Sequence, residues 1–337
     1  MKHSWQVTLL FVLFFLVSHI LGLFLIGNSV SFSTDAKGVS IISFKDTFVG
    51  EHPVMSDLES IIYLVVGITI GTLVLLFFAK KKKTSWWRIW FLIASWLAMT
   101  VSIQALFNSS TILLSVLAAF LALWKVYKPN VVIHNFTEVL IYTGITLIFV
   151  PMFSVLSMFI VLILISIYDA YAVWKSKHMV TLATFTRDAN LFPGFAVKYS
   201  LDDSKERNKK TEESTQFTAG RTQLADNSSQ FTASRTRQTA HSSWSADNRR
   251  LSNSRVGILG GGDVVFPLLF SGVSLIGLLK KGVSFEGAFS FALVISFCAT
   301  LSLFLLFYFS KKDRFYPAMP FLTAGTFFGY FLALILF

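Results

Sequence analysis

The sequence predicts an all-α, polytopic membrane protein with nine transmembrane helices. Hydrophobic residues make up 54% of the 337-residue chain, and charged residues make up only 14%. A soluble domain of this length does not have enough interior to hide so much apolar surface. The chain also divides into apolar runs that are long enough to cross a bilayer, separated by polar or basic segments.

Nine apolar runs account for the predicted helices, since about 20 helical residues span the hydrocarbon core. In chain order they cover residues 5–27, 58–79, 86–107, 110–127, 131–150, 153–175, 257–279, 284–310 and 317–337. The first run is too long for the apolar part of a signal peptide, and no small-x-small cleavage site follows it. We therefore expect it to remain in the protein as the first helix.

Lysine and arginine are concentrated in every second loop, and this bias predicts the orientation. Cytoplasmic loops of membrane proteins carry an excess of these residues. The rule places the N-terminus in the cytoplasm and the C-terminus outside, with Lys280 and Lys281 as a mild violation. The cytoplasmic basic stretches are then KKKKTSWWR at 80–88, KVYKP at 125–129, the segment 175–255, and KKDR at 311–314. We interpret them as anchors and orientation signals rather than binding sites.

The net charge of +11 indicates contact with anionic lipid rather than with nucleic acid, because the basic residues flank apolar spans. The single cysteine, Cys298, excludes an internal disulfide and a cysteine-rich metal site. We expect neither a metal nor a cofactor.

A polar segment divides the membrane part of the chain in two. Residues 201–255 are rich in Ser, Thr, Asn and Gln, and STQFTAGRTQ recurs in them as SSQFTASRTR. Such a composition cannot form a core, so we predict a mostly disordered cytoplasmic linker. Just before it, residues 178–197 have the apolar spacing of a short amphipathic surface helix that ends near Pro193. The predicted organisation is 1–177, 178–256 and 257–337.

Four ionisable side chains, His19, Glu138, Asp169 and Asp263, fall well inside the predicted spans, where an ionisable group is expensive and is a functional candidate by default. For His19 we favour a neutral imidazole with a partner on its own helix. Glu138 is close enough to the helix start to extend to the interface or to meet His134, so we favour a structural role and expect its replacement by Gln to change little. Asp169 and Asp263 remain as candidates for chemistry.

The two aspartates have similar predicted depths. Asp169 lies six residues before Lys175, and Asp263 lies eight residues after Arg255. As helix, these spacings correspond to roughly 9 Å and 12 Å below the same membrane face. Two carboxylates that share a site hold one proton between them. Aspartyl hydrolysis requires such a pair, because one carboxylate takes a proton from water while the other protonates the carbonyl oxygen.

Four glycines come shortly before Asp263, namely Gly257 and the run Gly260–Gly262. Missing Cβ atoms let another backbone approach closely and weaken the helix locally, as a protease needs. Close helix–helix packing is an alternative explanation. Pro267, four residues after Asp263, adds a further weakness.

Three motifs resemble those of the presenilin and signal peptide peptidase family. They are the family's YD motif at 168–169, its GxGD motif at 260–263, and a PAL-like motif, here PAM, at 317–319. Their order, their placement and the nine-helix count agree with the family. The stretch YDAYAVWKSKHMVTLA at 168–183 extends the likeness, most closely to compact archaeal members.

The resemblance implies an intramembrane aspartyl endopeptidase with Asp169 and Asp263 as its catalytic pair. It places motif residues of the active site at Tyr168, Gly260, Gly261 and Gly262, and substrate-binding residues at Pro317, Ala318 and Met319. Met319 replaces the usual leucine, which is similar in volume and polarity. We also expect Pro317 and Pro320 to prevent a regular helix start and to hold extended backbone near the carboxylates.

Within the family, the basic pattern matches the presenilin-like branch rather than the inverted signal peptide peptidase branch. This orientation implies transmembrane helix substrates such as membrane protein stubs, with signal peptides as the other substrate class. A substrate helix must unwind before water can attack, and pairing as an extra strand would offset part of that cost. We expect a plasma-membrane protein of a prokaryote or archaeon. The sequence leaves the oligomeric state open and favours activity without partner subunits.

Two other classes stay open from the residues alone. Prepilin-type peptidases also use a GxGD aspartyl design, but they lack the YD and PAL partners. An ion-coupled transporter or channel could use two membrane-embedded aspartates, although no inverted repeat relates the halves of the chain.

Overall fold

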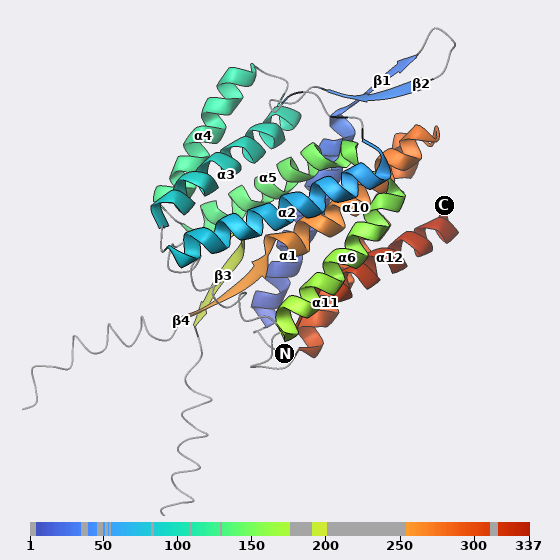
Figure 1. Cartoon of the computed structure of the whole chain (residues 1–337). Helices are drawn as coiled ribbons and strands as arrows, with labels where there is room; N and C mark the ends of the chain where they lie inside the picture. The colour runs from blue at the N-terminus through green and yellow to red at the C-terminus, as the bar shows by residue number, and fades with distance from the viewer. Residues whose placement is uncertain are drawn as a thin grey trace, which may run out of the picture. The chain divides into compact units, whose positions relative to one another are not determined.

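The computed structural model describes residues 5–34, 40–45, 50, 53, 55–81, 84–107, 110–128, 130–175, 191–200, 254–310 and 316–337 (Figure 1). The chain forms two compact units. One comprises Met1–Val197 with Ile258–Phe337, and the other comprises Lys198–Gly257. Every described helix belongs to the first unit. The predicted linker at 201–255 lies almost entirely outside the described residues.

Nine α-helices and one 3-10 turn lie in the described ranges. They are α1 (Trp5–Asn28), α2 (Asp57–Lys80), α3 (Thr84–Leu106), α4 (Thr111–Tyr127), α5 (Val131–Phe149), η1 (Val150–Met152), α6 (Val155–Trp174), α10 (Gly261–Lys280), α11 (Phe285–Phe309) and α12 (Ala318–Leu336). Eight of these are long and apolar enough to cross a membrane, while α4, with 17 residues, is shorter. The prediction of a polytopic helical protein with nine helices is confirmed for this part of the chain.

Four short strands add to the predicted helices. β1 (Val30–Thr34) pairs antiparallel with β2 (Ser40–Phe44), so that Val30 lies opposite Phe44. β3 (Gly194–Ser200) and β4 (Ser254–Gly260) form a second two-stranded sheet.

The second sheet adds strand where none was predicted and corrects one helix boundary. Residues 194–197, which follow the predicted end of the surface helix near Pro193, are strand, and the helix predicted from residue 257 begins at Gly261. Side chains alternate as a strand requires: Phe195 and Val197 are buried in β3, and Leu259 is buried beside the exposed Ile258 in β4. The rest of the predicted surface helix, 178–190, lies outside the described residues.

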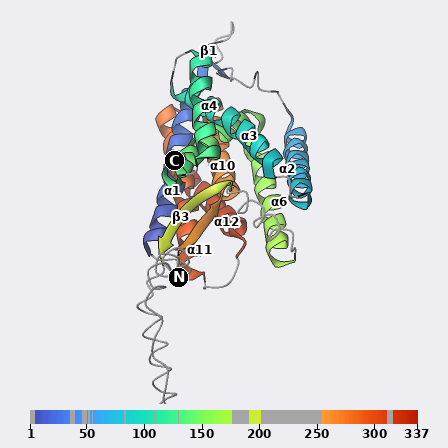
Figure 2. The ribbon, with the colours of Figure 1, turned by 90° about the vertical axis from the view of Figure 1, so that its left-hand side faces the viewer.

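Helix α10 forms the centre of the bundle and buries a larger share of its span, 72%, than any other described helix. It contacts α1, α5, α6, α11 and α12, which surround it in Figure 1. Helix α2 stands at the edge of the bundle (Figure 2), and only its Ser60 and Leu64 are buried. The central helix is therefore fixed by packing on most sides, whereas α2 is held loosely.

Glycines set the closest helix crossings away from the aspartates. A Cβ at Gly144 of α5 would collide with the backbone carbonyl of Ala98 in α3. One at Gly329 of α12 would lie 2.8 Å from the Cα of Ile295 in α11. Close helix packing, the alternative explanation for glycines in membrane spans, holds at these two crossings.

Candidate active site

Asp169 lies near the end of α6 and meets the start of α12. The backbone N–H of Met319 donates to its Oδ2 atom at 3.0 Å, and the N–H of Ala318 also donates to this carboxylate. The first N–H groups of a helix have no partner within the helix, and a carboxylate placed there satisfies them and the positive end of the helix dipole. Asp169 therefore ties α6 to α12 through hydrogen bonds that its negative charge strengthens.

A second contact joins the same two helices one turn further into the bundle, where the Ser166 and Thr323 hydroxyls lie 2.7 Å apart. Pro317 is the extended N-cap of α12 (φ −66°, ψ 121°), and the helix begins directly after it at Ala318. The expectation that two prolines prevent a regular helix start is therefore wrong. Pro320 lies in the first turn, where its missing N–H would have had no partner within the helix.

Asp263 is the third residue of α10, and its side chain is partly accessible. Its carboxylate folds back to accept the N–H of Gly260, the N-cap residue. It also interacts electrostatically with the Asp169 carboxylate, so the fold brings the two aspartates to one site. Because residues 254–260 are strand, the depth of Asp263 calculated as helix from Arg255 is wrong, and the pair is related by the electrostatic interaction between the two carboxylates.

Two of the glycines before Asp263 make room for side chains. A Cβ at Gly260 would lie 3.1 Å from the Asp263 carboxylate, and one at Gly261 would lie 2.8 Å from the Tyr142 ring. Gly262 is exposed, and a Cβ there would meet only Phe266, at an ordinary 3.5 Å. Gly260 and Gly261 therefore shape the site, while Gly262 leaves it open.

Helix α10 continues through Pro267 without a break. Proline has no N–H, so it cannot donate to the carbonyl of Asp263 four residues earlier. The helix is thus short of one hydrogen bond next to the carboxylate, which agrees with the local weakness expected from the sequence.

An apolar groove of about 1030 Å³ runs beside the site between α2, α5 and α10. Its lining includes Ile62 and Val66 of α2, Ile145 of α5, and Val265 and Phe266 of α10. Val265 and Phe266 lie two and three residues after Asp263. The groove is therefore an apolar surface that reaches the neighbourhood of the carboxylates from the loosely held side of the bundle.

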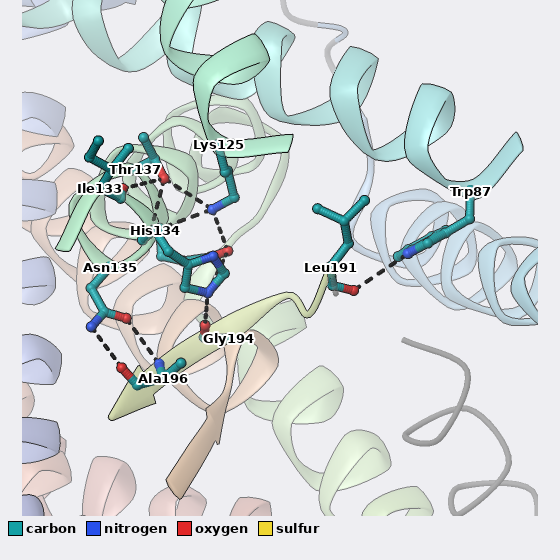
Figure 3. A network of polar contacts seen from close by, with 10 residues as sticks. Trp87, Lys125, Ile133, His134, Asn135, Thr137, Leu191, Gly194 and Ala196 are labelled. Atoms are coloured by element: carbon teal, nitrogen blue, oxygen red, sulfur yellow. Dashed lines mark hydrogen bonds and ion pairs between the residues drawn. The ribbon is translucent and has the colours of Figure 1, made fainter. Parts of the chain in front are cut away.

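A buried ion pair joins α4 to the second turn of α5. The Lys125 Nζ atom of α4 lies 2.6 Å from Glu138 Oε1 and 3.1 Å from the Thr137 hydroxyl (Figure 3). Both charged side chains are about 1% exposed. Glu138 therefore does not extend to the interface, and Lys125 is a paired core residue rather than a loop anchor. His134 lies 3.8 Å from Glu138, as the secondary partner.

His134 and Asn135 hold β3 against α5. His134 Nε2 lies 2.8 Å from the Gly194 carbonyl, so this ring nitrogen is the donor. The Asn135 amide donates to the Ala196 carbonyl at 2.8 Å and accepts the Ala196 N–H at 2.9 Å, as a neighbouring strand would (Figure 3). These side chains occupy one edge of β3, whose sheet partner is β4.

The same sheet leads into the start of α10. The N–H of Gly261 donates to the Pro193 carbonyl at 3.2 Å, which joins the residue before β3 to the residue after β4. Asp263 follows two residues later. Side chains of α5 therefore position this aspartate through the sheet, a connection that the sequence analysis missed.

The structure also describes the surroundings of His19 and Tyr168, two other residues singled out from the sequence. His19 is buried, stacks on Phe15, and pairs its Nδ1 with the Phe15 carbonyl at 2.9 Å. This is the structural role predicted for it. Tyr168 is 48% exposed on α6, and no polar contact of its side chain is found in the described part of the chain; nothing in the structure explains its place in the motif.

Two interacting carboxylates inside a bundle of apolar helices are what an intramembrane aspartyl hydrolase requires. Comparison with known proteins agrees. The profile of the family described as signal-peptide peptidase, presenilin aspartyl protease matches residues 12–337. The chain therefore belongs to this family, and it is a multi-pass intramembrane aspartyl protease.

Solved structures support the fold. The chain is similar to a presenilin family intramembrane aspartate protease in the C222 space group, with a TM-score of 0.55 and 16% identity over 98% of this chain and 99% of that chain. A second solved structure, of a presenilin family intramembrane aspartate protease in the P2 space group, has a TM-score of 0.53 and 15% identity over 99% of this chain and 98% of that chain. A search of curated proteins finds no match.

Proposed function

We propose that Asp169 and Asp263 are the catalytic pair of this protease, and that residues 260–263 act as its GxGD motif. The observation that carries the proposal is their meeting at one site from α6 and α10, although each comes from a different part of the chain. Both side chains are partly accessible, whereas Glu138, the other carboxylate of this region, is buried and neutralised by Lys125. Asp169 and Asp263 are therefore the carboxylates suited to catalysis.

The proposed reaction uses the pair as one unit that holds a single proton. The ionised carboxylate takes a proton from water as the water oxygen attacks the peptide carbonyl, and the protonated carboxylate gives its proton to the carbonyl oxygen. Proton transfer to the peptide nitrogen then releases an amine and a carboxylic acid. The N–H groups of Ala318 and Met319 stabilise negative charge on Asp169 and hold it in place.

We infer that the substrate is an unwound transmembrane segment that pairs with β4. The other strand of this sheet, β3, is covered on its second edge by His134 and Asn135, while β4 has no further strand neighbour among the described strands. A strand added to β4 would lead its backbone toward Asp263. The apolar groove between α2, α5 and α10 would take apolar side chains of the segment.

Strand pairing predicts a dependence on substrate N–H groups. N-methylation of single amides beside the cleaved bond should reduce kcat/KM by about tenfold at alternate positions, because alternate N–H groups face β4. The measurement is cleavage of a series of singly methylated peptides. A uniform effect at every position would contradict the strand arrangement.

We also propose the presenilin-like orientation, with the N-terminus and the segment 178–256 in the cytoplasm between the membrane portions 1–177 and 257–337. Lys125 no longer supports it, because Glu138 neutralises this lysine. The clusters at 80–88, 175–255 and 311–314 still do. The proposed location is the plasma membrane of a prokaryote or archaeon.

Reporter fusions test this topology. A reporter after Lys83 and one within 201–255 should read cytoplasmic, while a reporter near Lys45 and one after Phe337 should read external. An external reading within 201–255 would assign the chain to the inverted branch and reverse the orientation of its substrates.

Cleavage by the purified protein tests the proposed function and the need for partners. The protein, purified alone in detergent, should cut a generic transmembrane peptide, and an aspartyl transition-state analogue should block the reaction. Ion flux through the protein in liposomes without cleavage of any spanning peptide would instead favour the transporter alternative. Activity of the chain alone would also establish that it acts without partner subunits.

A further inference from the structure

Tyr142 occupies a buried position between α5 and the proposed catalytic aspartate. Its side chain is 2% exposed, and it lies one helical turn from Glu138 on the same face of α5. Gly261 packs against its ring, since a Cβ there would lie 2.8 Å from a ring carbon and 3.0 Å from the hydroxyl oxygen. The Phe195 ring of β3 meets it edge-on, with 5.2 Å between centroids. The ring is thus held by α10 and by β3.

The Tyr142 hydroxyl has no hydrogen bond of standard geometry with any described residue, although it is buried. It makes a hydrogen bond of poor geometry with the Glu138 carboxylate, and it also lies near enough to Asp263 to interact electrostatically with that carboxylate. A buried hydroxyl with only a poorly aligned partner contributes little to stability, so phenylalanine in the same space should cost little. The hydroxyl therefore has two carboxylates near it and a well-aligned bond to neither in the resting protein.

Of the two carboxylates, Asp263 is the one that lacks a compensating charge. Glu138 is paired with the Lys125 ammonium at 2.6 Å. Asp263 accepts the Gly260 N–H and faces the negative charge of Asp169. A phenol has one proton to donate. When Asp263 gives up the proton that the pair shares, its carboxylate has no counter-charge, so a hydrogen bond from the phenol gains more there than at Glu138, which Lys125 already neutralises.

We propose that Tyr142 is a positioning residue of the active site, whose hydroxyl donates a hydrogen bond to the Asp263 carboxylate when substrate is bound. The bond orients Asp263 within the pair and holds its oxygen at the position from which it exchanges a proton with water or with the peptide carbonyl. This role rests on the proposed function of Asp263. The position of the Tyr142 ring also explains the glycine at 261, because any larger residue there would displace the ring.

The test is Tyr142→Phe, which removes one oxygen and keeps the ring between Gly261 and Phe195. We expect kcat for a transmembrane peptide to fall by about tenfold or more, with KM changed by less than about twofold, since the lost interaction acts in the transition state. Because the hydroxyl has no well-aligned partner in the resting fold, Tm should change little. The matched control, Tyr330→Phe, removes a phenol from an aromatic cluster of α12 and should leave kcat unchanged.

Each outcome decides the proposal. A wild-type kcat for Tyr142→Phe overturns it, and so does a loss of activity accompanied by a lower Tm, which would assign Tyr142 a structural role. Asp263→Asn is measured in parallel to separate the role of Tyr142 from the catalytic role of Asp263. If Asp263→Asn is active, the catalytic pair itself is wrong; if it is inactive while Tyr142→Phe is normal, only the role of Tyr142 is wrong.

Discussion

Replacement of either Asp169 or Asp263 by asparagine is expected to abolish cleavage, with kcat/KM lower by about 10⁴-fold or more. An amide cannot take a proton from water or donate one to the peptide carbonyl, so half of the catalytic pair is lost. Asparagine keeps the volume of aspartate, and its oxygen can still accept the N–H of Met319 or Gly260. Expression and Tm should stay near normal or rise slightly, because a desolvated carboxylate is removed.

The double variant Asp169→Asn/Asp263→Asn should be no less active than either single variant, because the two groups act as a unit. Asp57→Asn is the matched control, since Asp57 lies in the first turn of α2, outside the site. The unmodified protein should give a bell-shaped profile of kcat/KM against pH, with constants that belong to the pair. Cleavage by a clean preparation of Asp169→Asn at the unmodified rate would contradict the aspartyl mechanism.

The helices could be predicted because their cause is local. An apolar run must satisfy its own backbone in the membrane, and a helix does so without any other part of the chain. The strands β3 and β4 have a cause that is not local. β3 forms where the Asn135 side chain, some 60 residues earlier in the chain, hydrogen-bonds to the backbone of Ala196. The sequence of residues 194–200 alone does not indicate that partner.

The residues of the candidate site also differ in whether the sequence alone could indicate them. Asp169 and Asp263 stand out because an ionisable group in an apolar run is unusual wherever its partner lies. Tyr142 does not stand out, since tyrosine is common in membrane spans. Its signal was the four-residue spacing of His134, Glu138 and Tyr142, which puts all three on one face of a helix. Lys125 was misassigned because a lysine near a helix end usually marks the interface.

Loss of one member of the buried pair Lys125–Glu138 is expected to have the largest effect on stability. Lys125→Met would leave the Glu138 carboxylate buried without a counter-charge, and Glu138→Gln would do the same to the ammonium group. Removing one partner of a buried ion pair costs about 3–5 kcal/mol. The structure therefore replaces the earlier expectation that Glu138→Gln changes little. The measurement is thermal unfolding in detergent, with Lys128→Met at the exposed C-cap of α4 as the control.

The double variant Lys125→Met/Glu138→Gln separates the charge from the packing. With both charges gone, no uncompensated ion remains, so most of the lost stability should return, and a double-mutant cycle should give a coupling free energy of about 2 kcal/mol or more. If both single variants unfold within about 0.5 kcal/mol of the unmodified protein, the pair is not buried as described. Because His134 lies beside this pair and bonds to Gly194 of β3, the single variants should also loosen the sheet that precedes Asp263. Cleavage should then fall with stability in the single variants and recover with it in the double variant, a parallel that a catalytic role for Glu138 would not produce.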